Sequence, residues 1–277
     1  MNVDLQIDHL MNKVDSPQDA GDWFERCGFT VTPLSVIDSM GLCNRLVLFE
    51  PDYAGCANFI ELMGVIPGAA VQTAMAELLN GKDGSRSMVL MSKDAKVTHA
   101  QLKQRGFEPD QVHHVTRQWV LPNETLDLAF DVILPMPAPL TFNVCRYYTL
   151  QHYLRPLWLK HKNGVLRISS VMGVVQDVMQ AAAYYERLFG LKPRTVSHGH
   201  VLFEPGAIAL ELFSKDTYSE SGGTAGTATG FSGYKLACVD PKETKAWFAD
   251  AGVDGEWLVN GKTWATRAFG NDVWLVT

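Results

Sequence analysis

The 277-residue sequence is short of cysteine and lacks several common active-site motifs. Its five cysteines are widely spaced and form no CxxC pair, which argues against a disulfide framework and a structural zinc cluster. The chain contains no GxSxG, no GxxxxGK[ST] and no GxGxxG after a strand-like run. Serine-hydrolase, P-loop and dinucleotide-binding chemistry are therefore not expected.

Positive charge and long apolar runs are also scarce. The chain has 24 Lys and Arg against 30 Asp and Glu and no basic stripe, so we expect no nucleic-acid partner. No segment approaches the roughly 18 apolar residues of a membrane span. The first residues, MNVDLQIDHLMNKV, carry acids where a signal peptide would have an apolar core. We therefore expect a cytoplasmic protein with no membrane partner.

What the sequence does contain is a recurring order of strand, helix, strand, strand and strand. Residues 3–14 alternate as a strand, and residues 15–29 read as a helix that begins at Asp15 or Ser16 and ends at Gly28. Three strand-like runs follow, at 29–37, 44–50 and 57–65. The same order can be read again from residues 87, 165 and 233.

Two observations favour duplication over the common alternation of helices and strands. The segment DWFERCGFTVTP resembles AYYERLFGLKPR in the third copy. A glycine also ends each helix at a nearly constant distance from the strand before it. The distance is 19 positions for His9 to Gly28, Ser87 to Gly106 and Gly233 to Gly252, and 20 for Ser170 to Gly190.

Four such units predict an α+β protein of two domains. Modules 1–66 and 85–149 would form a first domain, 1–149. Modules 165–215 and 231–277 would form a second domain, 165–277. The aromatic and basic stretch 150–164 would link them. Modules of this kind can pair within a chain or between chains, and a homodimer is compatible with the sequence.

The paired βαβββ unit resembles the vicinal oxygen chelate superfamily, which includes glyoxalase I and the extradiol dioxygenases. The segments IDHLMNKV, AGDWFERCGFTVTP, MGLCNRLVLFE and FIELMGV look like its glyoxalase-like domain family. The resemblance covers residues 5–65 well, and residues 87–140 and 230–277 in pattern only. It implies two half-open barrels of paired modules. It also implies a divalent metal (Fe, Mn, Ni or Zn) and a lyase, isomerase or dioxygenase acting on a small, oxygenated, anionic substrate.

His9 is the first metal ligand that the resemblance implies. It follows Asp8 in the first strand, where regular alternation would put Ile7, His9 and Met11 on one face. A neutral imidazole suits Fe, Zn, Mn or Ni. The alternative is a core histidine that is hydrogen-bonded to a neighbour.

Glu61 is the second implied metal ligand and also a candidate catalytic group. It lies in the apolar run FIELMGV, where a carboxylate is costly unless it is paired, protonated or metal-bound. The alternative is a carboxylate that faces solvent or pairs with Arg45. Glu211 is the equivalent in the third module, but Ser170 stands there in place of the histidine. A metal is therefore not expected in the second domain.

The remaining candidates come from two segments. In MGLCNRLVLFE, Asn44 and Arg45 match the family's NRL element, and an arginine fork suits an anionic substrate. In CRYYTLQHY, Arg146 and Tyr147 would bind substrate, while Tyr148 and His152 would relay a proton. Arg146 stands where the family has a histidine, which leaves the third metal ligand unnamed. A free structural thiol is expected at Cys43, and a surface turn at the histidines of SHGH, His198 and His200.

These departures from the family pattern leave two functions open. One is a metal-dependent enzyme that uses the residues above. The other is a metal-free protein that binds a small molecule on the same scaffold. The aromatic residues of the second segment favour the second reading (Tyr147, Tyr148, Tyr153 and Trp158). A cavity lined by aromatic side chains and one arginine suits a small apolar carboxylate.

Overall fold

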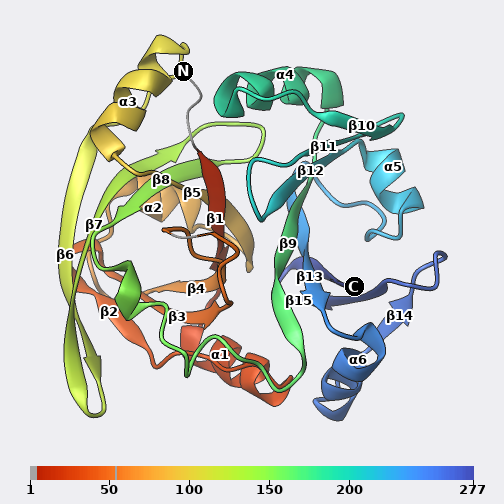
Figure 1. The fold of residues 1–277 in the computed structure, drawn as a ribbon, viewed down its shortest axis with the longest axis horizontal. Coiled ribbons are helices and arrows are strands. Elements are labelled where there is room, and N and C mark those ends of the chain that lie inside the picture. Colours follow the sequence, from red (N-terminus) through yellow and green to blue (C-terminus); the bar gives the residue numbers. More distant parts are fainter. Residues whose placement is uncertain (1–4, 54) are drawn as a thin grey trace.

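Two eight-stranded mixed sheets make up the protein, whose computed structural model describes residues 5–53 and 55–277 (Figure 1). The first sheet has the strand order β2-β3-β4-β1-β5-β8-β7-β6. Its strands are β1 (Gln6–Lys13), β2 (Ser35–Ile37), β3 (Leu42–Leu48), β4 (Phe59–Val65), β5 (Gly84–Met91), β6 (Val112–Leu121), β7 (Glu124–Met136) and β8 (Phe142–Tyr147). It carries the helices α1 (Pro17–Arg26), α2 (Thr73–Leu78) and α3 (Ala95–Gln104).

The second sheet repeats this order as β10-β11-β12-β9-β13-β16-β15-β14. Its strands are β9 (Val165–Val174), β10 (Arg194–Ser197), β11 (His200–Phe203), β12 (Ala209–Phe213), β13 (Gly230–Cys238), β14 (Gly255–Trp257), β15 (Trp264–Ala268) and β16 (Asn271–Val276). The helices are α4 (Val178–Phe189), α5 (Lys215–Glu220) and α6 (Pro241–Asp250). None of the helices in the described ranges is long and apolar enough to cross a membrane.

Each sheet pairs two modules in the same way. In the first, β1 runs parallel to β4 and antiparallel to β5; in the second, β9 runs parallel to β12 and antiparallel to β13. The first sheet curls almost into a closed barrel around an interior (Figure 1). The predicted α+β fold of paired modules is confirmed.

The glycines at the predicted helix ends all have positive φ angles. The values are 84° at Gly28, 78° at Gly106, 69° at Gly190 and 75° at Gly252. This left-handed region costs glycine little and terminates helices. Because the same special backbone conformation recurs in each module, the shared spacing reflects a structural requirement.

One predicted strand is much shorter than the sequence suggested. Of residues 29–37, only Ser35–Ile37 form a strand. The Thr32 hydroxyl accepts a hydrogen bond from the Leu46 backbone N–H, and Pro33 has no N–H to give. Side-chain bonding of this kind competes with a regular ladder.

The two sheets share one continuous hydrophobic core. A single buried cluster contains Phe24 and Val144 from the first half and Tyr185 and Phe248 from the second. The Asn58 side chain also makes two 3.0 Å hydrogen bonds across the sheets to the backbone of Ile168. The domain boundaries at 149 and 165 therefore stay a prediction.

The linker 150–164 is packed against the first sheet. Tyr153 and Trp158 belong to a buried cluster with Trp119 of β6. His161 accepts a bond from the Thr30 N–H and donates to the Leu48 carbonyl, both at 3.0 Å. Burial lowers the pKa of His161 to about 4, so this imidazole is neutral and structural.

Candidate functional site

A small cavity of about 80 Å³ lies inside the first sheet. A single water needs about 10–15 Å³ of such space, so the cavity has room for a small molecule. Most of the wall is apolar, with four thioethers and several rings: Met11, Met40, Met63, Met75, Phe59, Phe130, Tyr147 and Tyr153. The polar groups His9, Asn44, Glu61, Asn143 and Arg117 are set into this wall. The cavity is therefore suited to a mainly apolar molecule with a few polar atoms.

The His9 side chain reaches the cavity because β1 is irregular. In the pairing with β5, Ile7 lies opposite Leu90 and His9 opposite Val89, so Asp8 is an extra residue. A bulge of this kind reverses the alternation of the strand. Ile7 accordingly packs in the core while His9 lines the cavity. The expectation that Ile7 and His9 share a face was wrong for this reason.

The same bulge brings the Asp8 carboxylate to His9. Asp8 Oδ1 lies 2.7 Å from His9 Nδ1, and the Tyr147 hydroxyl donates to the same oxygen at 3.0 Å. The other oxygen accepts the Ala57 N–H at 2.8 Å. Sequence reasoning missed Asp8 as a site residue. The adjacent polar residues Asp8 and His9 were the available signal. Neighbouring residues of a strand point to opposite faces, so at least one of the two had to face the protein interior.

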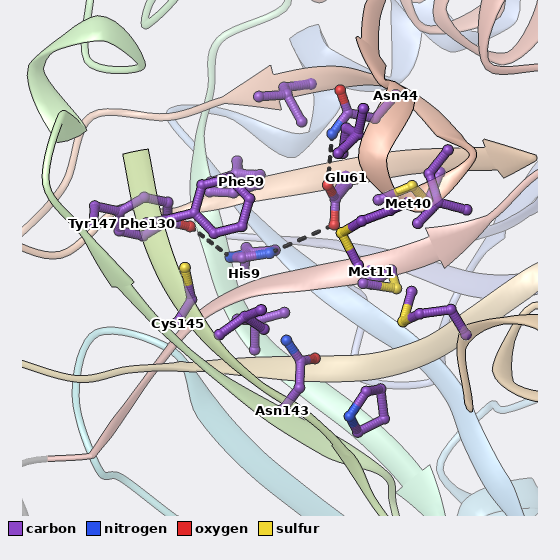
Figure 2. A pocket seen from close by; sticks show the side chains of 18 of the residues that line it. His9, Met11, Met40, Asn44, Phe59, Glu61, Phe130, Asn143, Cys145 and Tyr147 are labelled. Atoms are coloured by element: carbon purple, nitrogen blue, oxygen red, sulfur yellow. Dashed lines mark hydrogen bonds and ion pairs between the residues drawn. The ribbon is translucent and has the colours of Figure 1, made fainter. Parts of the chain in front are cut away.

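Glu61 and Asn44 complete the polar end of the cavity. Glu61 Oε2 lies 3.6 Å from His9 Nε2, and its other oxygen accepts the Asn44 Nδ2–H at 2.7 Å. Figure 2 shows His9 between Tyr147 and Glu61, with Asn44 beyond the carboxylate. The Asn44 side-chain oxygen is buried without a hydrogen-bond partner. The structure thus brings together four predicted site residues: His9, Asn44, Glu61 and Tyr147.

The charge state of His9 follows from its neighbours. Burial by itself would lower the pKa of His9, but hydrogen bonds and charges from Asp8 and Glu61 outweigh burial and raise that pKa above its usual value. Two carboxylates flank one ring, and their negative charges favour the imidazolium form. Burial and the Asp8 charge raise the pKa of Tyr147, so its hydroxyl stays protonated.

Arg45 faces away from the cavity. Its guanidinium donates to Asp22 at 2.7 Å, to Glu25 at 2.5 Å and to the Thr32 carbonyl at 2.8 Å. It crosses α1 at Gly21, where a Cβ would lie 2.5 Å from Arg45 Nη1. Arg45 and Asn44 are adjacent strand residues, so their side chains take opposite faces. Arg45 was expected to contact the substrate or, alternatively, to pair with Glu61. The structure shows neither contact.

Arg146 and Tyr148 also lie outside the cavity lining. Within β8, Asn143, Cys145 and Tyr147 line the cavity, so Arg146 takes the other face. Its guanidinium donates to the Lys93 carbonyl and lies 3.8 Å from the centre of the Tyr148 ring. Strand alternation therefore turns Arg146 away from the cavity in which it was expected to bind substrate.

The two groups expected to relay a proton are placed elsewhere. The Tyr148 hydroxyl donates to Asp131 at 2.8 Å, and its side chain is largely exposed. His152 ends the short 3-10 helix Leu150–His152 and does not line the cavity. Cys43 is half-buried, and burial raises the pKa of its thiol. None of these three side chains is positioned to act with His9.

A divalent metal would find two donors in this cavity. They are His9 Nε2 and Glu61 Oε2, 3.6 Å apart. A facial site of two histidines and a carboxylate needs a third donor, and in this fold it would come from β5 or β8. The side chains that these strands turn to the cavity are Val89, Asn143, Cys145 and Tyr147, and the Tyr147 hydroxyl already donates to Asp8.

None of these four side chains completes a metal site. Asn143 accepts a hydrogen bond from Ser87 at 2.7 Å. Burial raises the pKa of the Cys145 thiol well above its usual value, and metals bind the thiolate. Within residues 5–53 and 55–277, no three His, Cys, Asp or Glu side chains gather in a metal-binding group. The residues present do not fit a three-ligand metal centre.

The second sheet has a related polar cluster built from different residues. Glu211 accepts from Ser170 at 2.5 Å, from His200 at 3.0 Å and from Lys235 at 2.8 Å. Burial alone would raise the pKa of Glu211, but these donors lower it to about 2. His198 lies in the predicted turn, whereas His200 begins β11 and points inward. The carboxylate here is fully occupied by protein donors.

Comparisons with known proteins agree with this architecture. A model of the family described as "Glyoxalase-like domain" matches residues 7–189. A sequence search of curated proteins found no match. A hypothetical protein from Staphylococcus aureus is similar in structure, with a TM-score of 0.66, 10% identity and 98% of each chain covered.

Two further solved structures share the fold. A mutant of 4-hydroxymandelate synthase from Streptomyces coelicolor aligns with a TM-score of 0.58 and 10% identity, over 99% of this chain and 92% of that one. A fusion of a xylose isomerase-like TIM barrel with a 4-hydroxyphenylpyruvate dioxygenase aligns with a TM-score of 0.55 and 15% identity. That alignment covers 99% of this chain and 48% of the fusion. At these identities the likeness concerns the fold.

Proposed function

The chain belongs to the glyoxalase-like domain family, and from this premise we propose that its first sheet binds a small, largely apolar molecule through a polar group held by His9, Glu61 and Asn44. The observation that carries this proposal is the buried Asn44 oxygen without a donor. Leaving such an acceptor unsatisfied costs about 1–3 kcal/mol. A hydroxyl or N–H group on a bound molecule would satisfy it.

The neighbouring pair suits the same ligand group. His9 Nε2 and Glu61 Oε2 are 3.6 Å apart, which is longer than a direct hydrogen bond. A ligand oxygen can bond to both in place of their direct contact. Because His9 is held at Nδ1 by Asp8, its Nε2–H has a fixed direction toward that oxygen. His9 and Glu61 are also the groups placed to exchange a proton with a bound molecule.

A metal-dependent enzyme is the second candidate. The observation that favours it is the convergence of His9 Nε2 and Glu61 Oε2 on one point of the cavity. Lyase, isomerase and dioxygenase activities all remain within this reading. The missing third donor from β5 and β8 makes it the weaker of the two.

Ligand-observed NMR with a fragment set tests the binding proposal. Asn44→Leu keeps the side-chain size and removes the unsatisfied acceptor, while Met63→Trp fills the cavity. We expect fragments that carry a hydroxyl or amide to bind the wild type, to weaken about tenfold in Asn44→Leu, and to lose binding in Met63→Trp. Asn123→Leu, in the turn between β6 and β7, is the control. Fragment binding that Met63→Trp leaves intact would place the site elsewhere and reject the proposal.

A further inference from the structure

Arg117 brings the two edges of the first sheet together. It lies on β6, the last strand of the sheet, and donates from Nη1 to the Ser35 hydroxyl and to the Val36 carbonyl, the latter at 3.5 Å. Ser35 and Val36 belong to β2, the strand at the opposite edge. The guanidinium therefore closes the barrel and also lines its cavity. Sequence reasoning did not single out this arginine.

The charge of Arg117 has no partner of opposite sign. No carboxylate of the described chain forms an ion pair with it, and its Nε is buried without an acceptor. Arg45, which is more deeply buried than the half-buried Arg117, is paired with two carboxylates. Even partial removal of a charge from water is unfavourable when the charge is unpaired. Arg117 is also the one Lys or Arg among the described residues that line the cavity.

Arg117 lies across the barrel from the polar end that contains His9. In the order β2-β3-β4-β1-β5-β8-β7-β6, β1 is the fourth strand and β6 the eighth. Once β2 and β6 meet, four steps separate β1 from β6 in either direction around the barrel. The wall between them is formed by Met and aromatic side chains. A molecule that contacts both ends must therefore span the cavity.

Resting on the proposed function, we propose that the ligand is an apolar monocarboxylate that spans this cavity, with its carboxylate on Arg117 and its hydrogen-bonding group on Asn44, Glu61 and His9. A guanidinium edge fits a carboxylate with two parallel bonds. The Nη1 bonds to β2 leave the Nε edge for this contact. Tyr153 lines the same cavity, and burial raises its pKa to about 12, so its hydroxyl stays a neutral donor.

A panel of paired probes tests the ligand class. Each pair contains an apolar carboxylate, such as 4-phenylbutyrate, and its primary amide, which has nearly the same shape and no charge. Binding is measured by isothermal titration for the wild type, Arg117→Met, Arg117→Lys and Ser35→Ala. Ser35→Ala removes the hydroxyl contact to β2 and keeps both the Val36 carbonyl contact and the guanidinium. Arg194→Met, on the exposed strand β10, is the charge-matched control.

For pairs that bind, the wild type should prefer the carboxylate at least tenfold, or about 1.4 kcal/mol. Arg117→Met should abolish this preference while keeping amide affinity, and Arg117→Lys should keep part of it. Ser35→Ala and Arg194→Met should keep it in full. Equal binding of carboxylates and amides to the wild type, or an unchanged preference in Arg117→Met, overturns the ligand class but leaves the proposed function standing. If neither member of any pair binds, both proposals fail.

Discussion

The carboxylate of Asp8 and the imidazole of His9 are in direct contact, with 2.7 Å between Oδ1 and Nδ1. Adjacent residues of a regular strand point to opposite faces, so this contact depends on the bulge at Asp8. The bulge fixes which ring nitrogen faces the protein and which faces the cavity. A single backbone irregularity thus orients the central polar group of the site.

Asp8→Asn tests the role of this contact. The amide is neutral, so the pKa of His9 should fall, because burial would then outweigh the remaining Glu61 interaction. The measurement is an NMR titration of the imidazole. Asp110→Asn, at an exposed carboxylate that pairs with His113, is the control and should leave the pKa of His9 unchanged. A His9 pKa equal to that of the wild type would contradict this account.

The raised pKa of His9 also determines how the stability of the protein changes with pH. Because the folded pKa of His9 is raised, its contribution is fully present below about pH 6.5, the unfolded value. It is lost as the pH rises through the folded value. The free energy of unfolding of the wild type should exceed that of Asp8→Asn most strongly below about pH 6.5. Urea unfolding across the pH range measures this difference.

Arg45→Met should affect stability and not ligand binding. The substitution leaves Asp22, Glu25 and the Thr32 carbonyl without their donor. We expect a loss of about 2–4 kcal/mol in the free energy of unfolding, reduced by the exposure of the two carboxylates. Fragments should bind to the remaining folded protein with wild-type affinity. If Arg45→Met lost fragment binding at unchanged stability, Arg45 would instead be a ligand-binding residue.

Glu211 should make the protein sensitive to acid. Its pKa is lowered from 4.5 to about 2 in the folded state. The stabilisation is therefore present above about pH 4.5 and lost as the pH falls toward 2. The shift corresponds to about 3 kcal/mol. Urea unfolding at several acidic pH values should show a steeper loss for the wild type than for Glu211→Gln, and Glu204→Gln, at an exposed site, should match the wild type.

Metal binding separates the two candidate functions. We expect the protein, dialysed against Fe(II), Mn(II), Ni(II) or Zn(II) and analysed by plasma mass spectrometry, to hold far less than one metal per chain. His9→Ala should give the same value. One equivalent of metal in the wild type that is lost in His9→Ala would instead support the metal-dependent enzyme.

The fold could be predicted because its signals are local and repeated. The glycines that end the helices (Gly28, Gly106, Gly190 and Gly252) require a backbone conformation that each module shares. Polar residues before the helices, such as Ser16 and Asp94, cap them through side-chain bonds. Signals of this kind do not depend on the rest of the molecule, so they can be read from one sequence.

The site could be predicted only in part, because the direction of each side chain depends on strand register. His9, Asn44, Glu61 and Tyr147 were named from motif positions and do meet. Whether a side chain enters the cavity depends on small details of the strands. The bulge at Asp8 turns His9 inward, whereas Arg146 points away because it lies one residue from Tyr147 in β8. Register of this kind is set by partner strands far away in the sequence.

Arg117 is a cavity residue that could not be recognised from the sequence. Its importance comes from the meeting of β2 and β6, which are far apart in sequence. No local pattern in VHHVTRQWVL distinguishes this arginine from one on a solvent-exposed strand. Only the closed barrel makes it a cavity residue.

Methionine methyl NMR tests the central claim, that the cavity of the first sheet is the binding site. With 13C-labelled methyl groups, the strongest-binding fragment should shift the signals of the four cavity methionines (Met11, Met40, Met63 and Met75). Met172, in the core of the second sheet, and the exposed Met179 should not move. Shifts at Met172 with no change at the four cavity methionines would contradict the claim.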